Sequence, residues 1–565
     1  MEAPSPWRER EVAPQQLGRL RMALAAEFGT LAFMLTSEQL QGLGEAELRA
    51  LAQGLLAQIT ERDAEIALRQ AQLMQADGEI LMKDRKLVWS EARIDQLTHE
   101  IAVLKRWKFS ARSEQLDAAQ KNLLDETVDA DIAAIELELE LFRTKPQTPP
   151  PQHPKRAPLP AHLPRTSFHH EPACTTCKCG CELKRIGEDV SEKLDYTPGV
   201  FTVERHVRGK WACAKCETLV QAPVPAQVID KGMPTAGLLA QVLVAKYADH
   251  MPLYRQESIF ARAGMPLARS TLAEWVGVCG VQLQPLVDAL KQEILSHSVL
   301  HADETPVAML TPGKKKTHKA YLWAYCPGVF EDLRAVVYDF ADSRAGEHAR
   351  AFLQQGSEPW IGKLVCDDYA GYKASFTQGV TEIGCAAHAR RKFFELQAST
   401  KSAVAEQAMK FFGELYEIER EVHGLTMQQR LAIRQHKARP VADALHAWMI
   451  AHRLRATDGT ALARALDYSL KRWTALTRYI DDGQLPIDNN WVENQIRPIA
   501  LGRSNWLFAG SLRAGQRAAA VMSLIQSAKL NGLDPYAYLK DVLQRLPTHK
   551  ARLVGELLPH RWTPG

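Results

Sequence analysis

The sequence predicts an α/β protein with a long α-helical region near its N-terminus and a small metal-binding module. Apolar residues recur every seven positions over residues 48–105, six cysteines cluster between residues 174 and 216, and strand and helix patterns alternate from residue 296. The chain has 565 residues, of which 46% are hydrophobic and 24% are charged. This length and composition allow several globular domains.

Charge, targeting signals and cysteine use limit the classes of function. The formal net charge of +4 is small for 565 residues, so binding to nucleic acid has to depend on local basic clusters. The N-terminal residues do not resemble a signal peptide, and no run of about 18 apolar residues predicts a membrane span. The clustered cysteines indicate metal binding in a reducing compartment rather than disulfides.

Residues 45–143 are predicted to form a coiled-coil and basic helical region, after a helical or flexible segment at residues 1–44. One heptad position is apolar throughout: Ile59, Ile66, Leu73, Ile80, Leu87, Ile94 and Ile101. The second seam is largely polar, so a short or weak coiled coil between copies of the chain fits best. The alternative is one long amphipathic helix that packs on its own chain.

Basic and aromatic residues alternate just after the heptads, in residues 105–116. The candidate DNA-binding residues of this segment are Lys105, Arg106, Lys108 and Arg112, interleaved with Trp107 and Phe109. Such a surface can follow a nucleic-acid backbone and stack on bases. A solvated helix end with two core anchors explains the pattern equally well. The proline-rich residues 144–165 are predicted to be a stiff linker.

Two cysteine knuckles predict a small zinc-ribbon module at residues 166–222. Cys213 and Cys216 form the second pair of ligands. The first pair comes from Cys174, Cys177, Cys179 and Cys181. Spacing alone favours Cys174 with Cys177, because two intervening residues let one turn direct both sulfurs at one ion. Four thiolates are typical of structural zinc, since a catalytic zinc needs an open position.

The next segment, residues 223–295, is predicted to be helical. Within residues 252–276, one helix reaches Gly264 and a second begins at Ser270 or Thr271, which resembles a helix-turn-helix unit. Helical hairpins are common in proteins, so this pattern fits DNA binding and simple packing alike.

Residues 296–510 are predicted to form one α/β domain. Three consecutive strands are followed by helix, strand, helix and strand, which is the order of a ribonuclease-H-like core. Residues 400–482 have no strand signals and are predicted to be a helical insertion in this domain. Residues 511–565 are predicted to be a C-terminal helical region.

Acidic residues of this domain are candidate metal ligands. Asp303 lies within a predicted strand, where aspartate is disfavoured without a partner. Asp367 and Asp368 end another strand, and ligand sites lie at strand ends in α/β folds. Glu493 lies in IDNNWVENQIRP and shares a helix face with Arg497. A solvent-facing strand residue, a turn cap and a surface salt bridge are the simpler explanations.

Three carboxylates that converge from two strands and a helix would bind two Mg²⁺ ions through oxygen. Such a site activates a water or a 3′-hydroxyl, and it cuts or joins phosphodiester bonds by in-line displacement. Basic residues expected around the site, where they would neutralise DNA phosphates, are Lys314, Lys315, Lys316, Arg390, Arg391, Lys392, Arg503, Arg513 and Arg517. His301, His388 and Arg497 are further candidates for contacts with the acids or with phosphate.

Long motifs of the chain resemble those of the insertion-sequence-66 family of bacterial transposases. They are HADETP, CDDYAGY, CAAHARRKFF, IDNNWVENQIRPIALGRSNWLFAGS and SAKLNGLDPYAYL, and the match covers about residues 45 to 560. The resemblance implies a DNA transposase with a ribonuclease-H-like domain, in which Asp303, Asp367 and Glu493 are the catalytic acids. It also implies cleavage at 3′ ends, strand transfer and a multimer that joins two element ends.

The same resemblance implies accessory proteins from the same element and a bacterial, cytoplasmic, nucleoid-associated protein. The family's Cys-x-x-Cys-Gly turn favours Cys177 with Cys179, because Gly180 follows Cys179. The first zinc pair therefore stays open. Two other functions compete: a structure-specific nuclease of the same fold that cuts without joining, and a non-catalytic zinc and coiled-coil DNA-binding regulator.

Overall fold

The computed structural model describes residues 44–109, 118–142, 159–197, 199–230, 232–311 and 314–564. The predicted N-terminal segment, most of the proline-rich linker and Arg112 lie outside these residues. The chain divides into two compact units, Met1–Arg93 and Ile94–Gly565. No helix in the described ranges is both long and apolar enough to cross a membrane.

Helix α3 is the single long helix that the heptads predict. It spans Glu45–Phe109, which is 65 residues. In the first unit its apolar heptad residues face solvent: Leu73 is 64% exposed, Ile80 55% and Leu87 60%. Exposed Ile-rich faces of this kind are typical of helices that pair in coiled coils. Association of α3 with a second copy of the chain stays a prediction.

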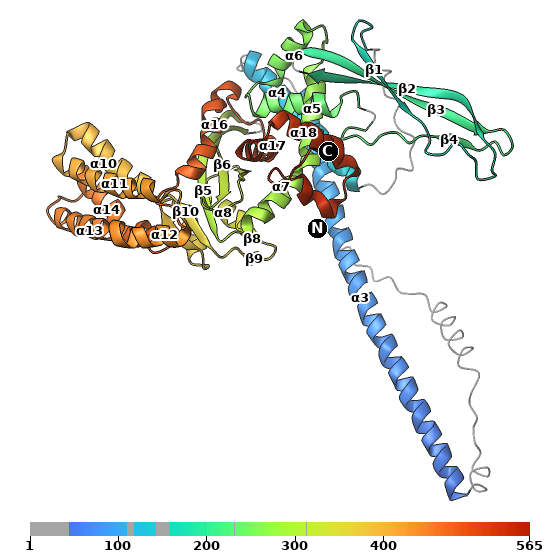
Figure 1. The fold of residues 1–565 in the computed structure, drawn as a ribbon, viewed down its shortest axis with the longest axis horizontal. Coiled ribbons are helices and arrows are strands. Elements are labelled where there is room, and N and C mark those ends of the chain that lie inside the picture. The colour runs from blue at the N-terminus through green and yellow to red at the C-terminus, as the bar shows by residue number, and fades with distance from the viewer. Residues whose placement is uncertain are drawn as a thin grey trace, which may run out of the picture. The chain divides into compact units, whose positions relative to one another are not determined.

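The cysteine-rich module is a four-stranded sheet (Figure 1). Its strands are β1 (Arg165–His170), β2 (Leu183–Thr197), β3 (Val200–Cys213) and β4 (Leu219–Gln221). Strands β2 and β3 form a long antiparallel hairpin, and β1 and β4 pair with β3. Leu183 pairs with Cys213 at the open end of the hairpin, so the register brings the two cysteine segments to one place.

Three helices follow the module: α5 (Ala236–Tyr247), α6 (Leu253–Arg262) and α7 (Arg269–Leu295). Helix α6 ends in a turn that contains Gly264 with a φ of +84°, and α7 begins earlier than predicted, after Ala268.

Helix α7 is a core helix. Leu272, Ala273 and Val276, near its start, are at most 1% exposed, and α4 (Ala118–Phe142) packs against it. A Cβ on Gly277 would stand 2.3 Å from the Ala130 carbonyl oxygen, so the two helices touch there. The helix pair exists, and the start of α7 buries one face while Ser270 and Glu274 are exposed, so DNA binding by this pair stays a prediction.

The central α/β domain contains a mixed five-stranded sheet of order β11-β10-β5-β6-β7. The strands are β5 (Val299–Thr311), β6 (Lys314–Pro327), β7 (Val337–Ala341), β10 (Lys363–Cys366) and β11 (Thr381–Gly384). Strands β5, β6 and β7 are antiparallel, whereas β5, β10 and β11 are parallel. The expected order of three strands, helix, strand, helix and strand is present, with α8 (Gly346–Phe352) and α9 (Lys373–Phe376) as the helices. A short hairpin, β8 (Gln354–Gln355) with β9 (Glu358–Pro359), precedes β10.

C-terminal helices cover this sheet. Helix α16 (Asn490–Trp506) packs on β5 and β6, α17 (Leu512–Leu530) packs on β7 and α7, and α18 (Pro535–Arg545) packs on α5. The backbone N–H groups of Val336 and Tyr338 donate to the hydroxyls of Ser527 and Ser523. These bonds satisfy the outer edge of β7, which would otherwise be open to pairing with another chain.

Residues 400–482, all of which the structure describes, contain helices and no strand, as predicted. After α10 (Ala386–Thr400), the insertion comprises α11 (Ala403–Val422), α12 (Met427–Ile433), a π-helical turn (Arg434–Ala438), α13 (Arg439–Arg453), α14 (Ala461–Lys471) and α15 (Trp473–Thr477). It has its own core, in which Arg434 is fully buried and pairs with Glu419. The guanidinium also donates to the carbonyls of Tyr479 and Leu485, so its burial leaves no donor group stranded.

Candidate active site and metal centre

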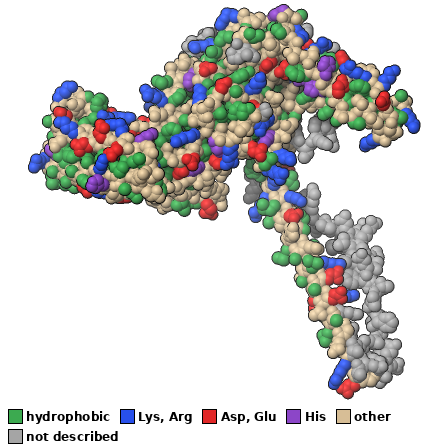
Figure 2. Space-filling view, viewed as in Figure 1, with side chains coloured by type: hydrophobic (Ala, Val, Ile, Leu, Met, Phe, Trp, Pro, Cys, Tyr) green, Lys and Arg blue, Asp and Glu red, His purple; other side chains and the backbone are tan. Residues whose placement is uncertain are grey.

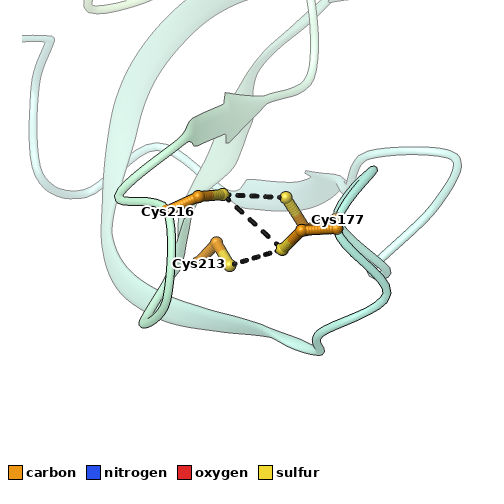
Figure 3. A group of neighbouring side chains, drawn as sticks. Cys177, Cys213 and Cys216 are labelled. Carbon is orange, nitrogen blue, oxygen red and sulfur yellow. Dashed lines mark hydrogen bonds between the residues drawn. The ribbon is translucent and has the colours of Figure 1, made fainter.

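Four cysteine sulfurs meet at the open end of the β2–β3 hairpin. Cys177, Cys179, Cys213 and Cys216 have sulfurs within 4.8 Å of one another. The Cys177 and Cys216 sulfurs are 3.1 Å apart (Figure 3). The Cys179 sulfur lies 3.6 Å from that of Cys213 and 3.7 Å from that of Cys216. Zinc–sulfur bonds of about 2.3 Å in a tetrahedron place sulfurs roughly 3.8 Å apart. Both the donor set and the spacing therefore fit structural zinc.

The structure separates the candidates for the first pair of cysteines. Cys174 is exposed, and its sulfur forms hydrogen bonds with the backbone of Thr176. The preference for Cys174 that rested on spacing is therefore wrong, since Cys177 and Cys179 lie with the second pair. The tight turn needed for a one-residue spacing is supplied by Gly180, which has a φ of +82°.

Asp303 lies in β5, and Asp367 directly follows the last residue of the neighbouring parallel strand β10. Val365 of β10 pairs with His301 of β5, so continuing the same register for two residues would bring Asp367 beside Asp303, since neighbouring strands lie about 4.8 Å apart. Burial and the carboxylates of Glu304, Glu493 and Asp367 raise the pKa of Asp303 well above its usual value. Crowded carboxylates of this kind are stabilised by a cation between them.

Glu493 comes to the same site from the first turn of α16. Its Oε1 lies 3.7 Å from Nδ1 of His388, and its Oε2 lies 3.7 Å from Arg391. The expected partner, Arg497, is exposed one turn further on, so the cations next to Glu493 come from α10 instead. Burial lowers the pKa of His388, although Glu493 acts in the opposite direction.

The three acids do not close into one compact cluster. The set at this site whose ligand atoms lie within 4.8 Å of one another is Cys385, His388 and Glu493. The carboxylates of Glu493 and Asp367 nevertheless raise the pKa of Asp303. In a two-metal site the three carboxylates need not all touch one another. The two ions stand about 3.5–4 Å apart, and only one carboxylate has to bind both of them.

Buried amides explain the unusual composition of the IDNNWVENQIRP motif. Asn489 is fully buried. Its Oδ1 lies 2.8 Å from Nδ1 of His301, and its Nδ2 donates to the Ala302 carbonyl over 2.9 Å. At the other end of α16, Arg503 donates to the Pro306 carbonyl. Helix α16 is thus fixed along β5 at both ends, with Glu493 between these contacts.

Two residues that the sequence analysis did not single out support the acids. Glu304 has a side chain that is only 1% exposed, pairs with Arg344 and accepts a hydrogen bond from the Tyr372 hydroxyl. Arg472, from the helical insertion, donates to the Asp367 carbonyl over 3.1 Å and pairs with Glu382. The acid next to Asp303 in HADETP was visible in the sequence, whereas nothing local marks Arg472.

Apart from Arg503, which donates to the Pro306 carbonyl, the expected basic residues differ in exposure and in partners. Lys316, Arg390, Arg391, Lys392 and Arg497 are exposed, and Figure 2 shows Lys and Arg side chains interspersed with acidic ones over the visible face. Arg513 and Arg517 instead hold α4, through Glu138 and Asp131, so their expected place around the site is wrong. The side chains of Arg106, Lys108, Lys314 and Lys315 lie outside the described part of the molecule, and Lys105 pairs with Glu136.

Family comparisons match the same modules. A model described as "Transposase IS66 family" matches residues 231–517, and the "IS66 C-terminal element" matches residues 523–560. The "zinc-finger binding domain of transposase IS66" matches residues 175–217, and "Transposase C of IS166 homeodomain" matches residues 96–167. The chain is therefore an insertion-sequence transposase. It belongs to the IS66 family, and this assignment suggests DNA as its partner.

Proteins of Sinorhizobium fredii resemble the chain along most of their length. The protein y4jD is 37% identical over 486 residues, which cover 82% of this chain and 94% of y4jD. The protein y4qI is 35% identical over 536 residues, which cover 92% of this chain and 97% of y4qI. Both are described as uncharacterized, so they support the family and add no activity.

Proposed function

We propose that the chain is a DNA transposase with a ribonuclease-H-like catalytic domain of the Asp-Asp-Glu type. In this proposal it binds the ends of its element, cleaves at the 3′ ends and joins them to target DNA. The supporting observation is that Asp303 lies in β5 and Asp367 directly follows the adjacent parallel strand β10, while Glu493 of α16 is close enough to Asp303 to raise its pKa.

The sheet order supports the ribonuclease-H-like assignment. Three antiparallel strands continue into two parallel ones, and the first strand, β5, lies in the middle. Its central place puts Asp303 where side chains from both β10 and α16 can reach it. The helical insertion then enters between β11 and α16, so it separates the second and third acids along the sequence.

The residues at the site fit Mg²⁺. Carboxylate oxygens are the ligands that Mg²⁺ prefers, and the raised pKa of Asp303 reflects a carboxyl buried beside other acids. Asp303, Asp367 and Glu493 would hold two ions, which when bound would activate the attacking oxygen and stabilise the leaving oxygen.

The chain's own side chains do the remaining work. The Arg472 side chain holds the Asp367 loop by donating to the backbone carbonyl of Asp367. Asn489 sets the position of α16. Arg390, Arg391 and Lys392 present positive charge from α10 towards an approaching phosphate backbone. Zinc at the four cysteines stabilises the hairpin module. A homo-oligomer that pairs through α3, together with accessory proteins of the element, would bring two DNA ends together.

A joining assay tests the proposal. The full chain is incubated with Mg²⁺, labelled DNA that carries the element's ends, and a target plasmid. Asp303→Asn, Asp367→Asn and Glu493→Gln should abolish cleavage and joining while leaving DNA binding intact. Asp332→Asn is the control, because Asp332 is an exposed residue of the loop between β6 and β7. Cleavage without joining would indicate a nuclease, and full activity of Asp303→Asn would overturn the catalytic assignment.

A further inference from the structure

Two polar atoms beside the proposed catalytic site face each other without hydrogen-bond partners. Nδ1 of His388 and Oε1 of Glu493 are shielded from solvent, make no hydrogen bond with any described residue, and lie 3.7 Å apart. We propose that His388 supplies a nitrogen ligand to the divalent cation held by Glu493. This inference rests on the proposed transposase function and adds a fourth protein ligand to that site.

The spacing suits a shared ion. A cation about 2.1 Å from each of two ligands places them roughly 3.0–3.5 Å apart, depending on the angle between the bonds. A small rotation of either side chain closes the observed 3.7 Å to that range. Buried polar atoms normally form hydrogen bonds, so two neighbouring buried atoms without one point to a common partner between them.

Backbone hydrogen bonds hold the two ligand-bearing helices next to each other. His388 lies in the first turn of α10 and Glu493 in the first turn of α16. The Ala386 N–H donates to the Ile487 carbonyl over 3.0 Å, and the Asn489 N–H donates to the Cys385 sulfur over 3.2 Å. These bonds link the starts of the two helices, so the ligand pair is preorganised before an ion arrives.

The other groups next to Glu493, Cys385 and Arg391, are less suited than His388 to be the additional metal ligand. Cys385 belongs to the same group of atoms, but its sulfur is fully buried and already accepts the Asn489 N–H. Arg391 stands at the other oxygen of Glu493, Oε2, and is itself exposed enough to turn towards a phosphate. Oε1 of Glu493 and Nδ1 of His388 therefore remain to bind a cation.

A nitrogen ligand alters which metals the site prefers. Imidazole favours transition metals, whereas Mg²⁺ prefers oxygen. A site of three carboxylates and one histidine should therefore bind Mn²⁺ more tightly than Mg²⁺. His388→Asp makes all the protein ligands oxygen atoms and should reduce the difference in affinity between the two ions.

Mn²⁺ provides a direct probe. The full chain, with zinc in its cysteine site and excess zinc removed, is titrated with Mn²⁺ and examined by pulsed electron paramagnetic resonance for coupling to a ligating ¹⁴N nucleus. Wild type should show this coupling, and His388→Asn should lose it and bind Mn²⁺ at least about tenfold more weakly. His388→Asp should retain Mn²⁺ without the coupling. His423→Asn, at the exposed end of α11, is the control and should match wild type.

The outcomes separate this inference from the proposed function. Mn²⁺ bound in wild type without ¹⁴N coupling, or coupling that persists in a folded His388→Asn protein, would overturn the role of His388 while leaving the joining assay unaffected. Mn²⁺ binding that Glu493→Gln does not weaken would also overturn it, since the two side chains would then not share the ion. Circular dichroism and zinc content verify that each variant is folded.

Discussion

Nδ1 of His301 lies 2.8 Å from Oδ1 of Asn489, although 188 positions separate the two residues in the sequence. The amide of Asn489 also donates to the Ala302 carbonyl, so one buried side chain ties the start of α16 to β5. Glu493 follows Asn489 by one helical turn. The contact therefore determines where the Glu493 carboxylate stands relative to Asp303.

Replacing Asn489 should disrupt this alignment. Asn489→Ala leaves buried groups of His301 and Ala302 unpaired, which should lower the free energy of unfolding by about 1–3 kcal/mol. Displacing a catalytic group by about 1 Å can reduce a rate by about 100-fold, and we expect a loss of this size in strand transfer. Urea unfolding and the joining assay measure the two effects.

Asn490→Ala is the matched control for that variant. Asn490 is exposed and its hydrogen bonds reach only Asp488 among the described residues. It should retain both stability and joining activity. Equal losses in the two variants would contradict the positioning role of Asn489.

The assignment of zinc ligands predicts different effects for two neighbouring cysteines. Cys179→Ser should abolish zinc binding by the full chain, because one of four sulfurs is lost. Cys174→Ser should keep one zinc per chain, because Cys174 lies outside the group. Metal analysis after dialysis measures zinc content, and hydrogen exchange at the ends of β2 and β3 reports whether the hairpin loosens. Zinc loss in Cys174→Ser alone would reverse the assignment.

Local patterns were sufficient to predict elements whose period is regular. The heptads predicted α3, the alternating segments predicted β5, β6 and β7, and the absence of strand signals predicted the helical insertion. Side-chain spacing within one element decides each of these features. The start of α7 was placed late because Ser270 and Thr271 are good cap residues, yet tertiary packing begins the helix after Ala268 without a side-chain cap.

Contacts between distant segments were beyond local patterns. The sequence indicated that Asp303, Asp367 and Glu493 belong together, but not that His388 and Arg391 would be the neighbours of Glu493. It assigned Arg513 and Arg517 to DNA, because a basic residue looks alike whether it meets a phosphate or a buried acid. Their partners, Glu138 and Asp131, lie on α4 more than 370 residues away.

Arg472 links the helical insertion to the catalytic sheet. Its side chain is 6% exposed, pairs with Glu382 and donates to the Asp367 carbonyl. Arg472→Ala leaves Glu382 without this partner and should destabilise the protein by about 3 kcal/mol. It should also reduce joining, because the Asp367 loop loses its support. Arg464→Ala on α14, where Arg464 is exposed and donates to the Gly459 carbonyl, should leave both properties unchanged; similar losses in both variants would contradict a specific role for Arg472.

Asp303 should make the metal-free protein less stable as the pH rises. Burial and the carboxylates of Glu304, Glu493 and Asp367 raise its pKa in the folded state, whereas an aspartate in the unfolded chain ionises near pH 4. Above about pH 4 the folded state therefore holds a proton that the unfolded state has released, and stability falls with increasing pH.

Asp303→Asn removes this penalty together with the proposed metal ligand. Without added divalent ions, the variant should melt at a higher temperature than wild type at about pH 8 and at a similar temperature near pH 4. Mg²⁺ should raise the melting temperature of wild type and leave that of Asp303→Asn unchanged, because ligand binding stabilises only the state that binds. Thermal unfolding across this pH range, with Asp332→Asn as the control that follows wild type, measures both effects. A metal-free wild type that is more stable than Asp303→Asn at about pH 8 would show that the buried carboxyl is already compensated by other groups of the chain.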